Sequence, residues 1–227
     1  MSKLFLFDIE GTTTDINFVH KILFPYSKEK MAQFLYDNST NKEVLDICDE
    51  VKKMAQEEDG QTLASLDDVS NKLISWIEDD RKVGPLKTIQ GLIWDYGYKN
   101  GDFKGHVYDD VKPFFEEIKA QGHTIGIYSS GSVHAQKLIF GYSTAGDLNP
   151  YISFYFDTKV GAKREVTSYQ NILNETKFEK ENVVFFSDIP QELAAAQAAG
   201  ITPVQLLRPG TESSDFFGIT DFQKFDL

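Results

Sequence analysis

The sequence predicts an α/β fold, in which a doubly wound and mostly parallel sheet carries an inserted all-helical cap domain. Three observations lead to this prediction. Short apolar runs of strand length end abruptly in small polar or acidic residues, helical patterns alternate with them in the second half of the chain, and one long early stretch shows helical periodicity alone. With 227 residues, the chain is long enough for a core domain and a smaller second one.

Three apolar runs are the clearest strand candidates, over residues 4–7, 125–128 and 183–186. They are rich in β-branched and aromatic residues and apolar on both faces, which suits strands buried in a parallel sheet. A further strand is expected over residues 203–207. Because the carboxyl ends of parallel strands meet at one edge of a sheet, the polar residues that follow these runs are expected to lie near one another.

Helical patterns separate these strands. Apolar residues recur at helical spacing in two segments: Val111, Phe114, Phe115 and Ile118, closed by Gly122, and then Val166, Tyr169, Ile172 and Leu173. A third helix is expected from Pro190 to Gly200, in the usual order of proline first and glycine last. This alternation of strand and helix implies right-handed crossovers and hence a doubly wound sheet.

Residues 17–105 contain no strand-like run. Apolar residues recur instead on helical faces, as in two triplets: Val44, Cys48 and Val51, then Val69, Leu73 and Trp76. A connection of this length is unusual inside a compact domain. We therefore expect a core domain made of residues 1–16 and 106–227 and a helical cap domain over residues 17–105.

Composition and charge exclude several classes of function. Lys and Arg total 23 and Asp and Glu total 35, so the formal net charge is −12. Such a field repels phosphate backbones and anionic lipid, and we expect a small-molecule substrate and neither a nucleic-acid nor a membrane partner. The single cysteine, Cys48, excludes an intrachain disulfide and a multi-cysteine zinc site. The apolar run at residues 4–7 is too short for a signal peptide or a membrane helix, so we expect a cytoplasmic protein and leave nuclear presence open.

The residues after the first strand form the motif Asp8-x-Glu10-Gly11-Thr12. Two carboxylates two residues apart at the exit of a strand can serve a divalent cation and a nucleophile together, and Gly11 permits the turn. Aspartate attacks phosphorus to give an aspartyl-phosphate that water hydrolyses in a second step. Taken alone, the motif fits a solvated turn equally well.

Three further groups follow in order along the chain. Ser129 and Ser130 come after the second strand and can offer hydroxyl and N–H groups to a phosphate, although such a loop is often only a helix cap. Lys163 precedes a predicted helix and can supply a fixed positive charge, although most such lysines face solvent. Asp188, with Glu192 four residues on, can complete a magnesium site, although Asp188 can also serve only as a helix cap.

Taken in this order, the aspartate, the hydroxyls, the lysine and the acidic pair resemble the motifs of the haloacid dehalogenase superfamily of aspartate-dependent phosphatases. That resemblance covers the core, roughly residues 1–16 and 106–227. A narrower resemblance extends over nearly the whole chain, because five segments are similar to the acireductone synthase family, the bifunctional enolase-phosphatases of methionine salvage. These segments are residues 8–14, 23–26, 86–91 together with Trp94, 128–133 and 156–159.

The resemblance implies a reaction. The family converts 2,3-diketo-5-methylthiopentyl-1-phosphate into its enediol phosphate by enolisation, and then removes the phosphate to give the acireductone 1,2-dihydroxy-3-keto-5-methylthiopentene. It uses one magnesium ion (Mg²⁺) per subunit and is usually a monomer. We therefore expect a magnesium-dependent enolase-phosphatase with a haloacid dehalogenase-like core.

The resemblance also implies the site residues. Asp8, Glu10 and Asp188 match the magnesium positions, whereas the substrate-binding positions are matched by Ser129, Ser130 and Lys163. Asp8 matches the catalytic nucleophile and Glu10 the catalytic acid/base of the wider superfamily.

The chain departs from these patterns at two positions. Glu10 stands where many superfamily members carry Asp; this agrees with the narrower family, and the extra methylene changes the reach of the carboxylate. Ala162 stands where the family often has His, which weakens any role for the residue before Lys163.

Alternatives remain for the function and for the helical domain. A general sugar-phosphate or nucleotide phosphatase would use the same core residues, and a phosphoaspartate-accepting signalling domain would also use acidic strand ends, a hydroxyl and a lysine.

We expect the helical domain to be a lid that excludes water. Its residues Gln90, Trp94 and Tyr98 either contact the thioether end of the substrate or simply pack the domain.

Overall fold

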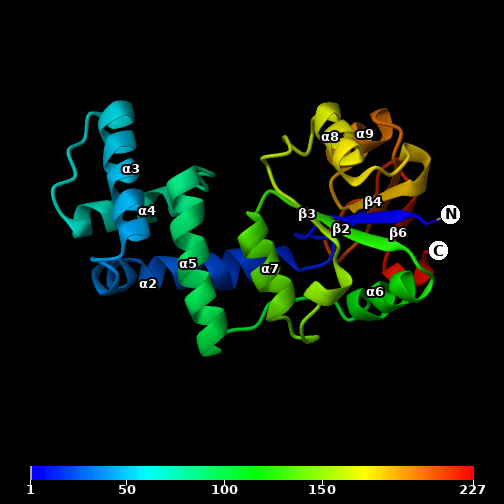
Figure 1. The fold of residues 1–227 in the computed structure, drawn as a ribbon, viewed down its shortest axis with the longest axis horizontal. Helices are drawn as coiled ribbons and strands as arrows, with labels where there is room; N and C mark the ends of the chain where they lie inside the picture. Colours follow the sequence, from blue (N-terminus) through cyan, green and yellow to red (C-terminus); the bar gives the residue numbers. More distant parts are fainter. Residues whose placement is uncertain (1) are drawn as a thin grey trace. The chain divides into compact units, whose positions relative to one another are not determined.

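The computed structural model describes residues 2–227 and divides the chain into two compact units. The core unit joins Met1–Phe18 to Lys104–Leu227, and the helical unit is Val19–Phe103. Both boundaries lie two residues from those expected from the sequence. Figure 1 shows the sheet in the core unit and helices alone in the other.

The core unit is built on a six-stranded sheet with the order β3-β2-β1-β4-β5-β6, in which all neighbouring strands are parallel. The strands are β1 (Leu4–Phe7), β2 (Thr124–Tyr128), β3 (Phe154–Phe156), β4 (Val183–Ser187), β5 (Thr202–Leu206) and β6 (Gly218–Ile219). The chain starts at β1, runs outward on one side to β3 and then crosses back to β4. This reversal confirms the doubly wound sheet and makes the carboxyl ends of β1 and its neighbours the point where such folds bind ligands.

The four strands expected from the sequence are confirmed, and two others, β3 and β6, were missed. These two strands have three and two residues. They lie at the two edges of the sheet. Segments this short contain too few residues to show a periodic pattern.

Side chains of the central strands alternate between two apolar layers. Leu4 and Leu6 face α8 (Val166–Thr176) and α9 (Pro190–Ala198), where they join a buried cluster. Phe5 and Phe7 face the opposite layer, which contains α6 (Val111–Ala120), and Phe7 stacks on Phe186 at 4.8 Å between ring centroids. The three helices expected from the sequence are therefore confirmed, and they cover both faces of the sheet (Figure 1).

The helical unit contains four long helices with a core of their own. They are α2 (Phe24–Asp37), α3 (Lys42–Asp59), α4 (Leu66–Glu78) and α5 (Gly84–Asn100). Cys48 and Trp76 are among the buried residues of this core, as their helical spacing predicted. Within residues 2–227, no helix combines the length and the apolar character needed to cross a membrane.

The three side chains considered for contact with the substrate are buried inside the helical unit. Gln90, Trp94 and Tyr98 are each less than a tenth exposed. Trp94 donates from Nε1 to the carbonyl oxygen of Leu23 at 2.8 Å, and Gln90 donates from Nε2 to Ser27 Oγ at 3.3 Å. These contacts favour packing of the unit over contact with the substrate.

Candidate active site

The sequence-predicted site residues follow the ends of three neighbouring strands. Phe7 of β1 pairs with Ile127 of β2 on one side and with Phe186 of β4 on the other. The backbone N–H of Asp8 continues this pairing by donating to the carbonyl oxygen of Phe186 at 2.9 Å. Parallel register therefore brings the loops that begin at residues 8, 129 and 188 to one edge of the sheet.

Asp8 and Lys163 form a buried ion pair, with 2.5 Å between Lys163 Nζ and Asp8 Oδ1. The same carboxylate oxygen accepts the backbone N–H of Ile9 at 2.7 Å. Both charged side chains are less than a tenth exposed. Two donors thus hold Oδ1 in place, while Oδ2 accepts neither of these bonds.

Lys163 also pairs with Glu192, at 2.6 Å from Nζ to Oε2. The same Glu192 oxygen accepts the Ser187 hydroxyl at 2.9 Å. A solvent-facing lysine, the alternative considered from the sequence, is therefore wrong. Glu192 was expected to bind a metal together with Asp188, but in the structure its carboxylate pairs with Lys163.

The turn after β1 depends on the close approach of Gly11 to Asp188. Gly11 has a φ of +74°, and a Cβ on it would lie 2.4 Å from Asp188 Oδ2. The Thr13 hydroxyl steadies the turn by donating to the carbonyl oxygen of Asp8 at 3.1 Å. Only glycine combines this backbone conformation with this contact.

Asp188 does not cap the helix that follows it. The N-cap position of α9 is Ile189, which lacks a side-chain cap, and the helix starts at Pro190. Asp188 Oδ1 is buried and has no hydrogen-bond partner in the described part of the chain. Burial raises the pKa of Asp188 to about 6, and the carboxylates of Glu192 and Glu10 contribute to the rise. A buried acceptor without a donor is costly, and a bound cation would satisfy it.

Negative charge is in excess around the ion pair. Burial raises the pKa of Asp8 well above its usual range; Lys163 opposes this rise, and Glu192 and Asp188 add to it. Burial by itself disfavours the charged form of Lys163, but Asp8 and Glu192 raise its pKa, so the lysine stays protonated. Three carboxylates around one ammonium provide a suitable environment for a divalent cation.

The carboxylates of Asp8 and Asp188 are of the donor type that magnesium prefers. Among residues 2–227, no three His, Cys, Asp or Glu side chains come close enough together to form a ready-made metal cluster. Magnesium commonly binds through one or two carboxylates and completes its octahedron with waters and substrate phosphate oxygens. Glu10, the third expected ligand, is partly exposed two residues beyond Asp8.

The serine loop follows β2 directly. Ser129 is buried; its N–H donates to the carbonyl oxygen of Phe156 at 3.1 Å, and its Oγ accepts the N–H of Gly131 at 3.1 Å. Ser132, rather than Ser129 or Ser130, caps the following helix, α7 (Val133–Gly141), by accepting the N–H of Ala135 at 3.2 Å. In the bond to Gly131 the Ser129 hydroxyl is the acceptor, so this bond leaves its proton available for another acceptor.

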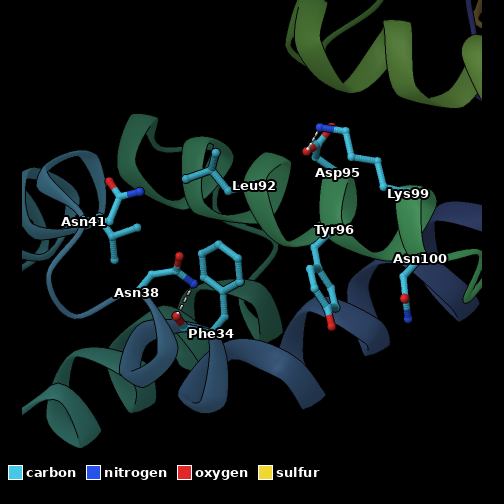
Figure 2. A pocket seen from close by; sticks show the side chains of 9 residues that line it. Phe34, Asn38, Asn41, Leu92, Asp95, Tyr96, Lys99 and Asn100 are labelled. Atoms are coloured by element: carbon cyan, nitrogen blue, oxygen red, sulfur yellow. Dashed lines mark hydrogen bonds and ion pairs between the residues drawn. The ribbon is translucent and has the colours of Figure 1, made fainter.

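A cavity of about 540 Å³ opens beside this site within the core unit. Gly11 and Asp188 line it together with Tyr108 and Arg208. A second cavity, of about 410 Å³, lies in the helical unit among α2, α5 and the start of α3 (Figure 2). There Lys99 pairs with Asp95 at 2.6 Å, and the amide of Asn38 bonds to its own helix, so we assign this second cavity no part in the chemistry.

A second buried ion pair at the site was missed in the sequence. Arg208 makes a bidentate contact with Asp110, at 2.9 and 3.0 Å, and donates from Nε to the carbonyl oxygen of Thr12 at 3.0 Å. It thus ties the turn after β1 to the amino end of α6. The only available signal was position, because Arg208 follows one predicted strand and Asp110 precedes one predicted helix.

Comparisons with known proteins found a matching family and several relatives. The haloacid dehalogenase-like hydrolase family matches residues 2–200. The chain is 47% identical over 217 residues to enolase-phosphatase E1 of Drosophila melanogaster, covering 92% of this chain and 85% of that one. It is 47% identical over 223 residues to enolase-phosphatase E1 of Picosynechococcus sp., covering 98% and 97%.

A solved structure extends the likeness to three dimensions. The crystal structure of the UTR4 protein of Saccharomyces cerevisiae matches with a TM-score of 0.84 at 33% identity, covering 99% of this chain and 100% of that one. The similarity therefore includes the helical unit as well as the core unit.

Proposed function

The chain belongs to the haloacid dehalogenase-like hydrolase family, and from this premise we propose how its residues carry out the reaction of an enolase-phosphatase. The protein is an enolase-phosphatase of methionine salvage, which acts on 2,3-diketo-5-methylthiopentyl-1-phosphate in two steps, enolisation and phosphate release. One observation carries the residue assignment. It is the buried contact of Lys163 with Asp8 at the carboxyl edge of the sheet, 2.5 Å between Nζ and Oδ1.

Asp8 is the nucleophile in phosphate release. Its Oδ2 attacks phosphorus, the bond from phosphorus to the substrate oxygen breaks, and that oxygen takes a proton from Glu10. Water then attacks the aspartyl-phosphate, which releases inorganic phosphate and restores the carboxylate. Lys163 and the Ser129 hydroxyl neutralise and orient the phosphate oxygens while charge moves between them.

Asp8 and Asp188 would hold magnesium, with Glu10 as the third expected ligand, and the ion would supply positive charge beside the phosphate and the diketone oxygens. The unpartnered Asp188 Oδ1 and the excess of carboxylates support this role. Glu10 is the candidate base for enolisation, because a carboxylate next to the substrate oxygens can remove a proton at neutral pH.

The remaining assignments concern the whole protein. We propose that the helical unit acts as a lid that excludes water, and that Ser130 joins Ser129 in binding the phosphate. We also propose that the protein works as a monomer in the cytoplasm, with its phosphate ester as its small-molecule partner.

The direct test follows enediol absorbance and inorganic phosphate together on the diketo phosphate, with and without magnesium. We expect both signals to depend on magnesium and the enediol to precede the phosphate. Phosphate release from generic esters without any enediol would instead identify a general phosphatase. A phosphoprotein that persists after acyl-phosphate treatment would support a signalling domain.

Variants test the residues in the same assay. Asp8→Asn is expected to abolish phosphate release, and Lys163→Ala to lower kcat/KM by about a hundredfold to a thousandfold, as the loss of a preorganised charge typically does. Glu10→Gln is expected to slow enolisation. Normal enolisation by Glu10→Gln would remove Glu10 as the base, and normal phosphate release by Asp8→Asn would overturn the nucleophile.

A further inference from the structure

The segment that carries Lys163 is held by a row of side-chain donors. Four consecutive carbonyl oxygens, of residues 160–163, each accept one hydrogen bond from a side chain. In chain order the donors are Asn171 Nδ2 at 3.0 Å, Tyr128 Oη at 2.9 Å, Ser168 Oγ at 2.7 Å and Tyr169 Oη at 2.7 Å. The last of these bonds ends on the carbonyl oxygen of Lys163 itself.

These donors stand on the elements that carry the rest of the site. Ser168, Tyr169 and Asn171 belong to α8, and Tyr128 is the last residue of β2, directly before Ser129. The rings of Tyr128 and Tyr169 are fully buried and meet edge to face at 5.6 Å between centroids. Packing therefore fixes both hydroxyls before any substrate binds.

The segment also lies so close to α8 that only glycine fits at its second position. Gly161 has a φ of +135°, and a Cβ there would lie 2.1 Å from Ser168 Oγ and 3.0 Å from Ser168 Cβ. The hydroxyl that would meet that Cβ is the one that donates to the carbonyl oxygen of Ala162. Loops are usually the mobile parts of a fold, and this one is fixed on two sides.

A fixed backbone matters because a lysine side chain is long. Four rotatable bonds separate the Lys163 backbone from Nζ, which lies between Asp8 Oδ1 and Glu192 Oε2. A shift of about 1 Å in a catalytic group can lower a rate about a hundredfold. The two carboxylates hold only the Nζ end of the side chain. The hydrogen bond to the Lys163 carbonyl oxygen holds its backbone end as well.

We propose that Tyr169 is a positioning residue, whose hydrogen bond to the Lys163 carbonyl sets the place from which the ammonium reaches Asp8 and the phosphate. Tyr128 has the related role of joining this segment to the serine loop. The inference rests on the proposed function of Lys163. The competing explanation is that buried carbonyl groups need donors and that the bonds serve stability alone.

A matched pair of variants separates these explanations. Tyr169→Phe and Tyr155→Phe each remove one hydroxyl from the core unit, and Tyr155 donates to Asn149 Oδ1 at 2.6 Å, away from the lysine segment. We expect a larger decrease in Tm for Tyr169→Phe, because its bond is buried and that of Tyr155 is only partly buried. We expect Tyr169→Phe to lower kcat/KM about tenfold and Tyr155→Phe to change it less than about twofold. Equal effects on kcat/KM would overturn the positioning role.

A double-mutant cycle provides a second readout that needs no turnover. The Kd of inorganic phosphate is measured by calorimetry in four magnesium-loaded proteins. They are the parent, the single variants Tyr169→Phe and Lys163→Ala, and the double variant. If Tyr169 acts through the lysine, Tyr169→Phe weakens phosphate binding in the parent but has no effect once Lys163 is Ala. Additive losses would show a structural role only.

The cycle also keeps the two proposals apart. Normal phosphate binding and turnover in Lys163→Ala would overturn the proposed function. A defective Lys163→Ala together with a Tyr169→Phe that behaves like Tyr155→Phe would overturn this inference alone. If Tyr169→Phe does not fold, Ser168→Ala takes its place in the cycle. Thr176→Val is then the control, because the Thr176 hydroxyl donates within α8, to the carbonyl oxygen of Ile172 at 2.8 Å.

Discussion

The unpartnered oxygen of Asp188 leads to a prediction about pH. With a pKa raised to about 6 by burial, this carboxyl is mostly ionised at pH 7 but only about one-tenth ionised at pH 5. A proton and a cation compete for the same oxygens. We therefore expect the apparent Kd of magnesium to rise about tenfold between pH 7 and pH 5, as measured by calorimetry.

The raised pKa of Asp188 also determines how the stability of the folded protein changes with pH. The folded protein binds the Asp188 proton more tightly than the unfolded chain does, so this contribution to stability is complete below about pH 4 and is lost as the pH rises through about 6. Bound magnesium offsets the loss. Magnesium chloride is therefore expected to raise Tm more near pH 7.5 than near pH 5, and less in Asp188→Asn. Equal increases at both pH values would contradict the assignment of Asp188 as a ligand.

The contact between Glu192 and Lys163 is one that the sequence did not predict. The sequence grouped Glu192 with Asp188 as an acidic pair that follows the strand ending at residue 187. The true partner of Glu192 is Lys163, 29 residues away, and no local pattern reports a contact of that separation.

At the scale of single elements, the turn after β1 offers a matched test. Gly11 and Gly122 have nearly the same φ, +74° and +75°, but a Cβ on Gly11 would meet Asp188 Oδ2 at 2.4 Å, whereas a Cβ on Gly122 would meet nothing within 4 Å. Gly11→Ala and Gly122→Ala are each expected to lower the free energy of unfolding by about 1–2 kcal/mol, measured with urea. Only Gly11→Ala moves the Asp188 carboxylate.

Gly11→Ala is therefore expected to raise the magnesium concentration needed for half-maximal activity at least tenfold, with no change in Gly122→Ala. Equal magnesium requirements in the two variants would mean that the contact between Gly11 and Asp188 has no bearing on the metal.

Elements differed in how far the sequence predicted them. Strands β1, β2 and β4 were predicted because their buried faces leave apolar runs, and their carboxyl ends then located the site. The burial of Lys163 was not predictable in this way. Its side chain pairs with Asp8 and Glu192, which lie far from it in the sequence, and a lysine before a helix gives no local sign of these partners.

At the scale of the whole molecule, two cores raise the question of how the chain unfolds. The helical unit contains both tryptophans, Trp76 and Trp94, so tryptophan fluorescence reports that unit alone. The core unit depends on Asp110, whose carboxylate binds Arg208 and also accepts the N–H of Phe222 at 2.7 Å. Units with separate cores are expected to unfold in separate steps.

Asp110→Asn tests this separation. The substitution leaves the buried Arg208 charge without its carboxylate partner, which typically lowers the free energy of unfolding by about 3–5 kcal/mol. We expect hydrogen exchange of peptides from β1 and β4 to speed up accordingly while the urea midpoint of tryptophan fluorescence stays unchanged. Lys224→Gln, which removes the exposed pair of Lys224 with Asp221 at 3.4 Å, is the control and is expected to cost less than about 1 kcal/mol. If Asp110→Asn lowers the fluorescence midpoint as much as it speeds exchange in the strands, the two units unfold as one.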